Sequence, residues 1–390
     1  MRIYHQCGHN TVWNVSSLED DSAGHGLIVS PVNIPSDKLA DRISQELRNT
    51  SFLDPQFYRP QDNKNYLETY TFFPANVLDG FNTTNFQSVA DTVATECLKF
   101  QHLLDFEYSI IPTRYYEHLP QEYLTELSNL FVDPFLQARE RLGISKPTLL
   151  TVIVRDPQLE DGLLRNELLS WITGFSEIAG VYVIFENSET SKQIKNPDHL
   201  VQVLRFINAL RLNDLEVHVG YTGVEGLLYS VSDPTSVTVG SYENLRSFDI
   251  SRMETSEGGD QRGPRPRVFS NVLLQSIVDT SLPPIRELYD NWTSLFADTP
   301  YKEFLLDPAS SLNFQRSEIY KHYFLSYHQL NSDLPADIPS RITSIKDMIS
   351  LAREKYAEIV DTGVVLDDDS DESHLIGWQN AIAMYQAKML

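Results

Sequence analysis

The sequence predicts an α/β protein: a (β/α)8 TIM-like barrel with an N-terminal capping strand and a C-terminal helical appendage. Short apolar runs alternate with amphipathic stretches over roughly 250 residues, the usual length of such a barrel. The apolar runs show little polar alternation, as expected for parallel strands that are covered on both faces. No G-x-G-x-x-G turn follows the first run, which disfavours an open dinucleotide-binding sheet.

The predicted strands are runs of apolar residues rich in β-branched and aromatic types. Helical periodicity follows most of them; Leu200, Leu204 and Ile207, for example, fall on one face of a helix. The short stretch "GLLYSV" between the sixth and seventh runs predicts one abbreviated helix. In chain order, the predicted strands cover residues 26–31, 70–75, 108–113, 149–156, 180–187, 216–221, 236–242 and 267–277.

These elements divide the chain into three parts. Residues 1–25 are expected to cap the barrel with an extra strand and a turn, residues 26–280 to form the barrel, and residues 281–390 to form helices only. The tail offers a docking surface for a protein partner. In its stretch "SEIYKHYFLSYHQL", helical spacing predicts four inward-facing side chains: Ile319, Tyr323, Phe324 and Tyr327.

Composition limits the possible partners and compartments. The net charge of −23 makes broad, non-specific nucleic-acid binding unlikely, although residues 262–267 read "RGPRPR" and could form a local basic patch. The acidic surface is best explained as a solubilising coat, with a basic partner as the alternative. No apolar run approaches the length of a membrane span. The two cysteines, Cys7 and Cys97, cannot build a disulfide framework, so we expect a cytoplasmic protein.

Polar side chains end several predicted strands, and the carboxyl ends of barrel strands face one mouth, where barrel active sites are built. We expect Asp156, Glu186 and His218 to converge there as catalytic residues. Two carboxylates can divide acid and base work, or one can attack an anomeric carbon. His218 is a candidate base if Val217 and Val219 face the helices. The alternatives are ion pairs that hold the rim together and a hydrogen-bonded core histidine.

The same mouth predicts a set of substrate-binding residues. Its arginines would suit a small anionic substrate such as a nucleotide. Asp54 comes from the long aromatic segment at residues 51–70, which is expected to fold over the mouth. The predicted substrate-binding residues are Asp54, Arg114, Arg155, Tyr221, Tyr242, Glu243 and Arg246.

The sequence predicts no metal and no cofactor. "HQCGH" puts His5, Cys7 and His9 on one face of an extended segment, and these residue types suit zinc. However, ligands at every second strand position seldom close a tetrahedral site, and no C-x-x-C pair accompanies them. The glycines of "GYTGVEG", residues 220–226, could cradle a phosphate with backbone amides or simply allow a tight turn.

Residues 216–246 resemble the late-barrel region of tRNA-guanine transglycosylase-like barrels. The resemblance consists of a strand that ends in a glycine step ("HVGYTG"), a short apolar helix ("LLYSV") and a strand followed by an arginine ("VTVGSYENLR"). It implies nucleoside or nucleotide chemistry, in which an aspartate attacks a ribose C1′. The family's aspartate-serine-glycine-glycine stretch and its zinc motif are absent, and Asp54 holds a comparable early position. The resemblance therefore transfers no catalytic residue.

Two functions of different classes follow from these observations. The first is a barrel-mouth enzyme that acts on a nucleoside-, nucleotide- or glycosidic-type substrate by carboxylate-based, glycosylase- or transglycosylase-like chemistry. The alternative is a non-catalytic barrel subunit of a larger assembly, which docks through its helical tail or its acidic surface. A polar, carboxylate-lined mouth would favour the first function, and a mouth filled with apolar side chains would favour the second.

Overall fold

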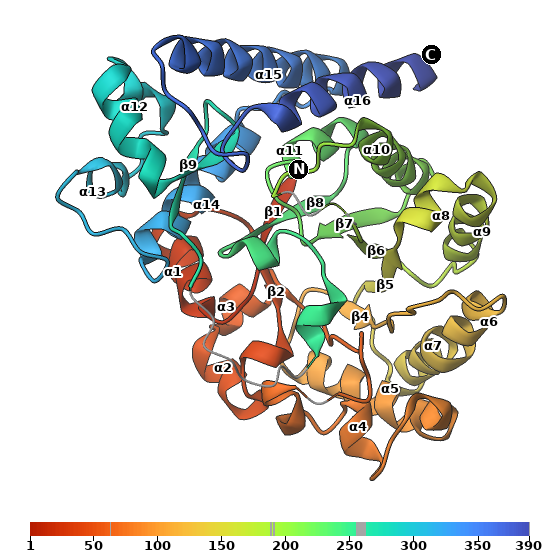
Figure 1. Cartoon of the computed structure of the whole chain (residues 1–390). Coiled ribbons are helices and arrows are strands. Elements are labelled where there is room, and N and C mark those ends of the chain that lie inside the picture. The colour runs from red at the N-terminus through yellow and green to blue at the C-terminus, as the bar shows by residue number, and fades with distance from the viewer. Residues whose placement is uncertain (63, 188, 190–191, 255–262, 390) are drawn as a thin grey trace.

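Eight parallel strands form one sheet that curves into a nearly closed barrel in the computed structural model (Figure 1). The structure describes residues 1–62, 64–187, 189, 192–254 and 263–389. The strand order is β3-β2-β1-β8-β7-β6-β5-β4, which confirms the predicted α/β barrel. The strands are β1 Arg2–Gln6, β2 Gly26–Val29, β3 Phe52–Leu53, β4 Ser109–Ile111, β5 Thr148–Val154, β6 Gly180–Phe185, β7 Glu216–Gly220 and β8 Ser236–Gly240.

The barrel closes between its two edge strands, β3 and β4. β3 is only two residues long, so these edges have no full ladder. Backbone hydrogen bonds join the chain on either side of the seam instead. The amide of Glu107 donates to the carbonyl of Ser51 at 2.9 Å, and the amide of Tyr115 donates to the carbonyl of Tyr58 at 2.9 Å. The two bonds tie β3 and its flanking loops to the β4 region.

Helices surround the sheet, and within the described residues no helix is both long enough and apolar enough for a membrane span. The barrel helices are α1 Thr11–Asp21, α2 Leu39–Arg42, α3 Gln45–Arg48, α4 Pro74–Val77, α5 Phe86–Leu103, α6 Tyr123–Leu127, α7 Asp133–Leu142, α8 Asp156–Glu160, α9 Gly162–Thr173, α10 Pro197–Arg211 and α11 Gly226–Tyr229. Beyond them come α12 Leu282–Leu288, α13 Lys302–Leu306, α14 Ser317–Ser332, α15 Ile338–Asp361 and α16 Ser373–Met389.

The N-terminal strand is part of the barrel, so the expectation that residues 1–25 form a cap was wrong. β1 lies between β2 and β8 and pairs in parallel with both, with His5 opposite Leu27 and Val239. The run "RIYHQ" is less apolar than the other strands. Two of its polar side chains are nevertheless buried, because each finds a hydrogen-bond partner in the fold. Gln6 accepts a hydrogen bond from Tyr182, and His5 bonds to the carbonyl of Ala23 on the helix side.

Two other predicted strands differ from the structure. Residues 70–75 form a turn and the start of α4, where Pro74 occupies the first helical turn. Their aromatic side chains are buried in a loop packed on α5, which explains the strand-like composition. Residues 267–277 do not continue the barrel. They belong to an antiparallel hairpin of β9, Arg267–Ser270, and β10, Gln275–Val278.

Helix α14 brings the tail into the core. The four residues predicted to face inward, Ile319, Tyr323, Phe324 and Tyr327, are all buried. The Phe324 ring lies 4.3 Å from the ring of His5 on β1, between centroids. Figure 1 shows α14 beside α1, β1 and the hairpin, where an eighth barrel helix would be expected. The chain after β8 therefore returns to cover the barrel with α14.

Helices α15 and α16 lie farther out and pack on the barrel helices (Figure 1). The indole of Trp378 on α16 donates to the carbonyl of Ile194 at 3.0 Å. The guanidinium of Arg341 on α15 donates to the carbonyl of Ser230 at 2.7 Å and to Asp233 at 3.1 Å. These helices form the outer layer of the tail.

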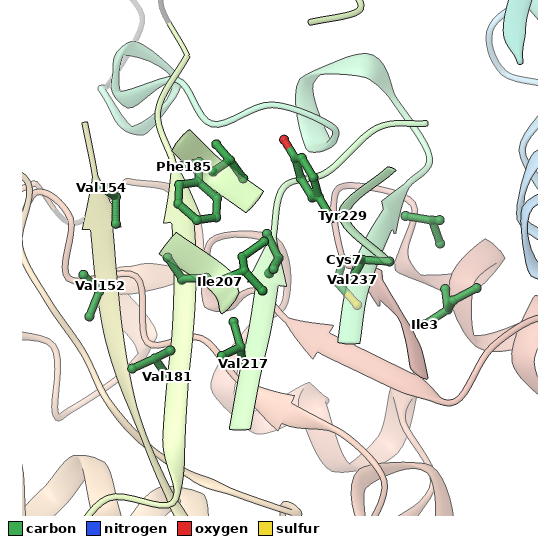
Figure 2. Packing of buried hydrophobic residues seen from close by; sticks show 14 of the residues in the cluster. Ile3, Cys7, Val152, Val154, Val181, Phe185, Ile207, Val217, Tyr229 and Val237 are labelled. Atoms are coloured by element: carbon green, nitrogen blue, oxygen red, sulfur yellow. The ribbon is translucent and has the colours of Figure 1, made fainter. Parts of the chain in front are cut away.

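Side chains alternate between the outside and the inside of the sheet. Figure 2 shows Val152, Val181, Val217 and Val237 on the outer side, in one cluster with Ile207 of α10. The interior holds a second, largely aromatic cluster. Its members include Tyr4, Ile28, Phe52, Tyr108, Ile110, Leu149, Tyr182 and Ile184.

We predict that Phe324→Ala lowers the free energy of unfolding by about 3–5 kcal/mol, because it leaves a cavity between α14 and β1. Urea unfolding would measure the change. Gln329→Ala, on the same helix but outside the buried set, should change stability by less than about 0.5 kcal/mol. A loss at Phe324 no larger than that of Gln329 would show that α14 is dispensable for the barrel.

Candidate functional site

The loop that follows β8 crosses the mouth of the barrel. Phe248 on this loop is buried, and the backbones of Phe248 and Glu186 form an isolated β-bridge. Its ring lies 5.2 Å from that of Tyr58 and 5.5 Å from that of Tyr221, between centroids. Tyr58 belongs to the segment expected to fold over the mouth, and it does so. Aromatic side chains therefore close the barrel axis.

Asp54 lies beneath this aromatic layer, at the end of β3. One of its carboxylate oxygens accepts a hydrogen bond from the Tyr58 hydroxyl at 2.6 Å, and the other accepts one from the amide of Gln56 at 3.0 Å. Burial raises the pKa of Asp54 to about 7, and these two hydrogen bonds oppose the shift only in part. Because Asp54 is almost fully buried, a ligand reaches it only if the aromatic layer moves.

An open cleft of about 700 Å³ lies to one side of the axis. We call it the mouth cleft. The ends of β6 and β7, the loop after β8 and the β9–β10 hairpin line it, and they contribute Glu186, Gly220, Glu225, Arg246 and Arg267. Of the predicted site residues, Arg155, Glu186, Tyr221, Glu243 and Arg246 line the mouth cleft.

Glu225 is the functional candidate that the sequence reasoning missed. It is buried, yet it lines the mouth cleft, and its carboxylate accepts a hydrogen bond from the amide of Gly223 at 2.7 Å. Burial raises the pKa of Glu225 from an ordinary 4.5 to about 7, while that amide and the charge of Arg246 partly oppose the shift. The sequence signal was its place in "GYTGVEG". The Glu225 carboxylate accepts the hydrogen bond of the Gly223 amide, which is one of the backbone amides considered for binding a phosphate.

Glu186 lies on the rim of the same cleft with two firm partners. Its carboxylate accepts a hydrogen bond from Arg155 Nε at 2.7 Å and one from the Tyr115 hydroxyl at 2.6 Å. Arg155 also donates to the backbone carbonyls of Tyr116 and Glu117. The rim ion pair considered as the structural alternative is therefore present, and it leaves Glu186 in the cleft with its charge balanced.

His218 does not join Glu186, so the expected convergence of three residues was wrong for His218, while Asp156 has a partner of its own. Asp156 starts α8 and contacts the ring of His199 on α10 at 3.1 Å. His218 does point into the barrel, but its ring bonds to Ser236 at 2.8 Å and to Glu216 at 3.2 Å.

Glu216 and Ser236 begin their strands, which places the His218 side chain in the half of the barrel remote from the mouth. The geometric reason is the alternation within a strand: an inward side chain from the middle of β7 fills the interior below the mouth rather than the mouth itself. Burial lowers the pKa of His218, as in a core histidine.

The remaining predicted residues lie around the mouth. Arg114 pairs with Glu126 at 2.9 Å and stacks on Tyr116, beside a small hollow between β4 and β5. Tyr221 has a φ of 53°, in the left-handed region that costs a non-glycine residue energy. Its hydroxyl accepts a hydrogen bond from Gln56 at 3.4 Å. The strained backbone turns the Tyr221 ring toward Phe248.

A second hollow, of about 540 Å³, shares Glu243, Arg246, Arg252 and Arg267 with the mouth cleft. We call it the arginine groove. It lies between the loop after β8, the hairpin and α14, and Tyr242 and Phe314 also line it. The predicted residues Glu243 and Arg246 thus line both adjoining hollows, whereas Tyr242 lines the arginine groove.

The described residues contain no group of three His, Cys, Asp or Glu side chains arranged to hold a metal ion. His5 and Cys7 are buried, and the His5 ring bonds to a backbone carbonyl, whereas His9 is exposed. Of the basic stretch at residues 262–267, Arg262 lies outside the described residues, and Arg265 and Arg267 line the arginine groove.

Comparison of the sequence with protein-family models finds no match, and comparison with curated proteins finds none either.

We predict that Glu225→Gln changes the pH dependence of stability. The folded chain holds a proton on Glu225 that the unfolded chain releases near pH 4.5, so this stabilisation is complete below about pH 4.5 and is lost as the pH rises through about 7. The unfolding free energy of the variant minus that of wild type should therefore rise by on the order of 3 kcal/mol between pH 4.5 and pH 8.

Urea unfolding at several pH values would measure this difference. The exposed Glu287 on α12 provides the control, since Glu287→Gln makes the same substitution at a carboxyl group that is not buried. Parallel pH profiles for wild type and Glu225→Gln would contradict the raised pKa.

Proposed function

We propose that this protein is an enzyme that acts in the mouth cleft on an anionic substrate of the nucleoside, nucleotide or glycosidic type, with Glu225 transferring a proton. The observation that carries the proposal is the combination at Glu225: a carboxyl group with its pKa raised to about 7 on the wall of an open cleft at the carboxyl ends of barrel strands.

A carboxyl group with a pKa near 7 is suited to general acid–base catalysis at neutral pH. Glu186 lines the same cleft, and its pairing with Arg155 differs from the burial of Glu225, which has no ion-pair partner among the described residues. Two carboxyl groups in unlike environments are the usual arrangement for cleaving a glycosidic bond. In the proposed hydrolysis, Glu225 protonates the leaving group as the bond to C1′ breaks. Glu186 faces the positive charge that develops at C1′. Water then forms a bond to C1′ and gives its proton to Glu225, which restores the acid.

The anionic substrate is proposed because of three arginines in the cleft, which is lined by equal numbers of acidic and basic residues. Arg246, Arg252 and Arg267 line it, although the chain as a whole carries a net charge of −23. Guanidinium groups bind phosphate and carboxylate oxygens with two donors at once. The resemblance of residues 216–246 to tRNA-guanine transglycosylase-like barrels supports nucleoside chemistry, because Glu225 and Arg246 both lie within that segment.

A second candidate function is a non-catalytic barrel subunit of a larger assembly. The aromatic closure of the axis by Tyr58, Tyr221 and Phe248 favours it, since such a mouth is filled by the protein itself. Exposed apolar side chains on the outer helices also favour it: Leu351 and Val360 on α15 are 45% and 57% exposed. We propose the enzyme first because an open mouth cleft lined by Glu186 and Glu225 lies beside the axis.

We predict that Glu225→Gln lowers the turnover of a glycosidic or nucleosidic substrate by about 100-fold or more, because it removes the proton donor. Incubation with nucleosides, nucleotides and aryl glycosides, followed by mass spectrometry of the released base or sugar, would identify the substrate and measure the rate. Glu107→Gln is the matched control. Glu107 pairs with Arg2 at the opposite end of the barrel, so its loss should leave turnover unchanged. Full turnover by Glu225→Gln would refute the assigned role.

A further inference from the structure

The arginine groove is a hollow whose charge is opposite to that of the protein. Arg246, Arg252, Arg265 and Arg267 line it, against a single acidic residue, Glu243. Glu243 contacts Lys192 and lies 3.6 Å from Arg267, so its charge is already balanced. Arg267 also pairs with Asp367 and Asp369, and Arg252 with Asp249, so Arg246 and Arg265 supply the charge that is left for an anion.

Two of these arginines still have donors for a ligand. Arg265 is exposed and has no hydrogen-bond or ion-pair partner among the described residues. Arg246 donates through Nε to the carbonyl of Gly240 at 2.9 Å and through one terminal nitrogen to that of Ser241 at 3.1 Å. Its guanidinium is stacked 3.9 Å from the centroid of the Tyr323 ring. Arg246 is therefore held in one orientation on the wall that the groove shares with the mouth cleft.

The groove also contains buried polar atoms that nothing in the described structure satisfies. The Ser241 hydroxyl and the Tyr323 hydroxyl are both buried without a hydrogen-bond partner. Ser241 and Tyr323 are at most 1% exposed, and both line the groove. Buried polar groups are normally paired, and leaving one unpaired costs about 1–3 kcal/mol. These hydroxyls lie beneath the wall of the groove, so a ligand would reach them only if that wall moved.

Aromatic side chains form the rest of the wall. Tyr242 and Phe314 are half-buried there, beside Tyr320, and Tyr242 packs edge-to-face with Tyr320 at 4.9 Å between centroids. The Asn10 side chain donates to the Tyr242 hydroxyl at 2.6 Å and holds the ring in place. Fixed rings beside cationic donors form a surface on which a flat heterocycle can stack, a contact worth about 1–3 kcal/mol for nucleic-acid bases.

From these observations we propose that the arginine groove is a binding site for a nucleoside phosphate, with the base against Tyr242 and Phe314 and the phosphate at Arg246 and Arg265. The site rests on the proposed function in one respect: it names the substrate class of the adjoining mouth cleft. Arg246 lines both hollows, and its positive charge acts to lower the pKa of Glu225. A nucleotide held in the groove therefore presents its phosphate end toward the wall next to Glu225.

Isothermal titration of the full-length protein tests the site, with ADP and GDP, their nucleosides and inorganic pyrophosphate as probes. We expect at least one nucleotide to bind with a dissociation constant below about 1 mM, and its nucleoside to bind about tenfold or more weakly. Arg265→Ala should weaken nucleotide binding about tenfold and leave nucleoside binding unchanged. Tyr242→Leu should weaken both. The control, Arg42→Ala, removes an exposed arginine of α2 and should have no effect.

Three results would overturn the site: no nucleotide binding at 1 mM, pyrophosphate binding as tightly as the nucleotides, or Arg265→Ala behaving like Arg42→Ala. Glu225→Gln separates this site from the proposed enzyme, because it should keep nucleotide binding while losing turnover. Nucleotide binding with the expected variant pattern but no turnover by wild type would support the groove and refute the enzyme. Turnover that is unchanged in both Arg265→Ala and Tyr242→Leu would support the proposed enzyme and refute the binding site in the arginine groove.

Discussion

A side chain on a ring of parallel strands points either into the ring or into the space between the ring and its helices. In this protein both places are filled. Valines such as Val181 and Val217 pack outward on the helices, while Tyr4, Phe52 and Tyr182 fill the interior. Polar groups inside have to be paired there, as His218 is with Glu216 and Ser236. The functional hollows can therefore lie only at the ends of the strands.

Because aromatic side chains fill the interior of the barrel, these hollows lie away from the barrel axis. Phe248 from the loop after β8 completes the packing of Tyr58 and Tyr221 and closes the centre of the mouth. The open space lies instead on the side of β6, β7 and β8, where the hairpin and α14 build a second wall. Residues far along the chain thus complete a site that begins at the strand ends, and α14 supports both the core and the groove.

The distribution of charge follows the same geometry. Most of the acidic surplus is free to lie on the surface, where water solvates it. Among the described residues, Asp54 and Glu225 are the exceptions, because the fold buries their carboxyl groups and raises the pKa of each to about 7. Backbone carbonyls hold four of the arginines that line the two hollows, namely Arg155, Arg246, Arg252 and Arg267, and Arg246 also stacks on the Tyr323 ring. A protein with an acidic exterior thereby retains a local basic wall at its mouth.

The sequence by itself determined the class of the fold. Continuous apolar runs and helical spacing follow from local burial, so β2 and the strands from β4 to β8, as well as the inward face of α14, were all readable from the chain. Tertiary pairing decided the rest. β3 has two residues and carries no periodicity, and β1 looks half-polar because His5 and Gln6 find partners only in the folded barrel. The same limit applies to the site. Position after a strand correctly placed Glu186, Tyr221, Glu243 and Arg246 at the mouth, but it also suggested Asp156 and His218, which face other partners. Glu225 was missed because its raised pKa comes from burial by side chains distant in sequence, and no local pattern records that burial.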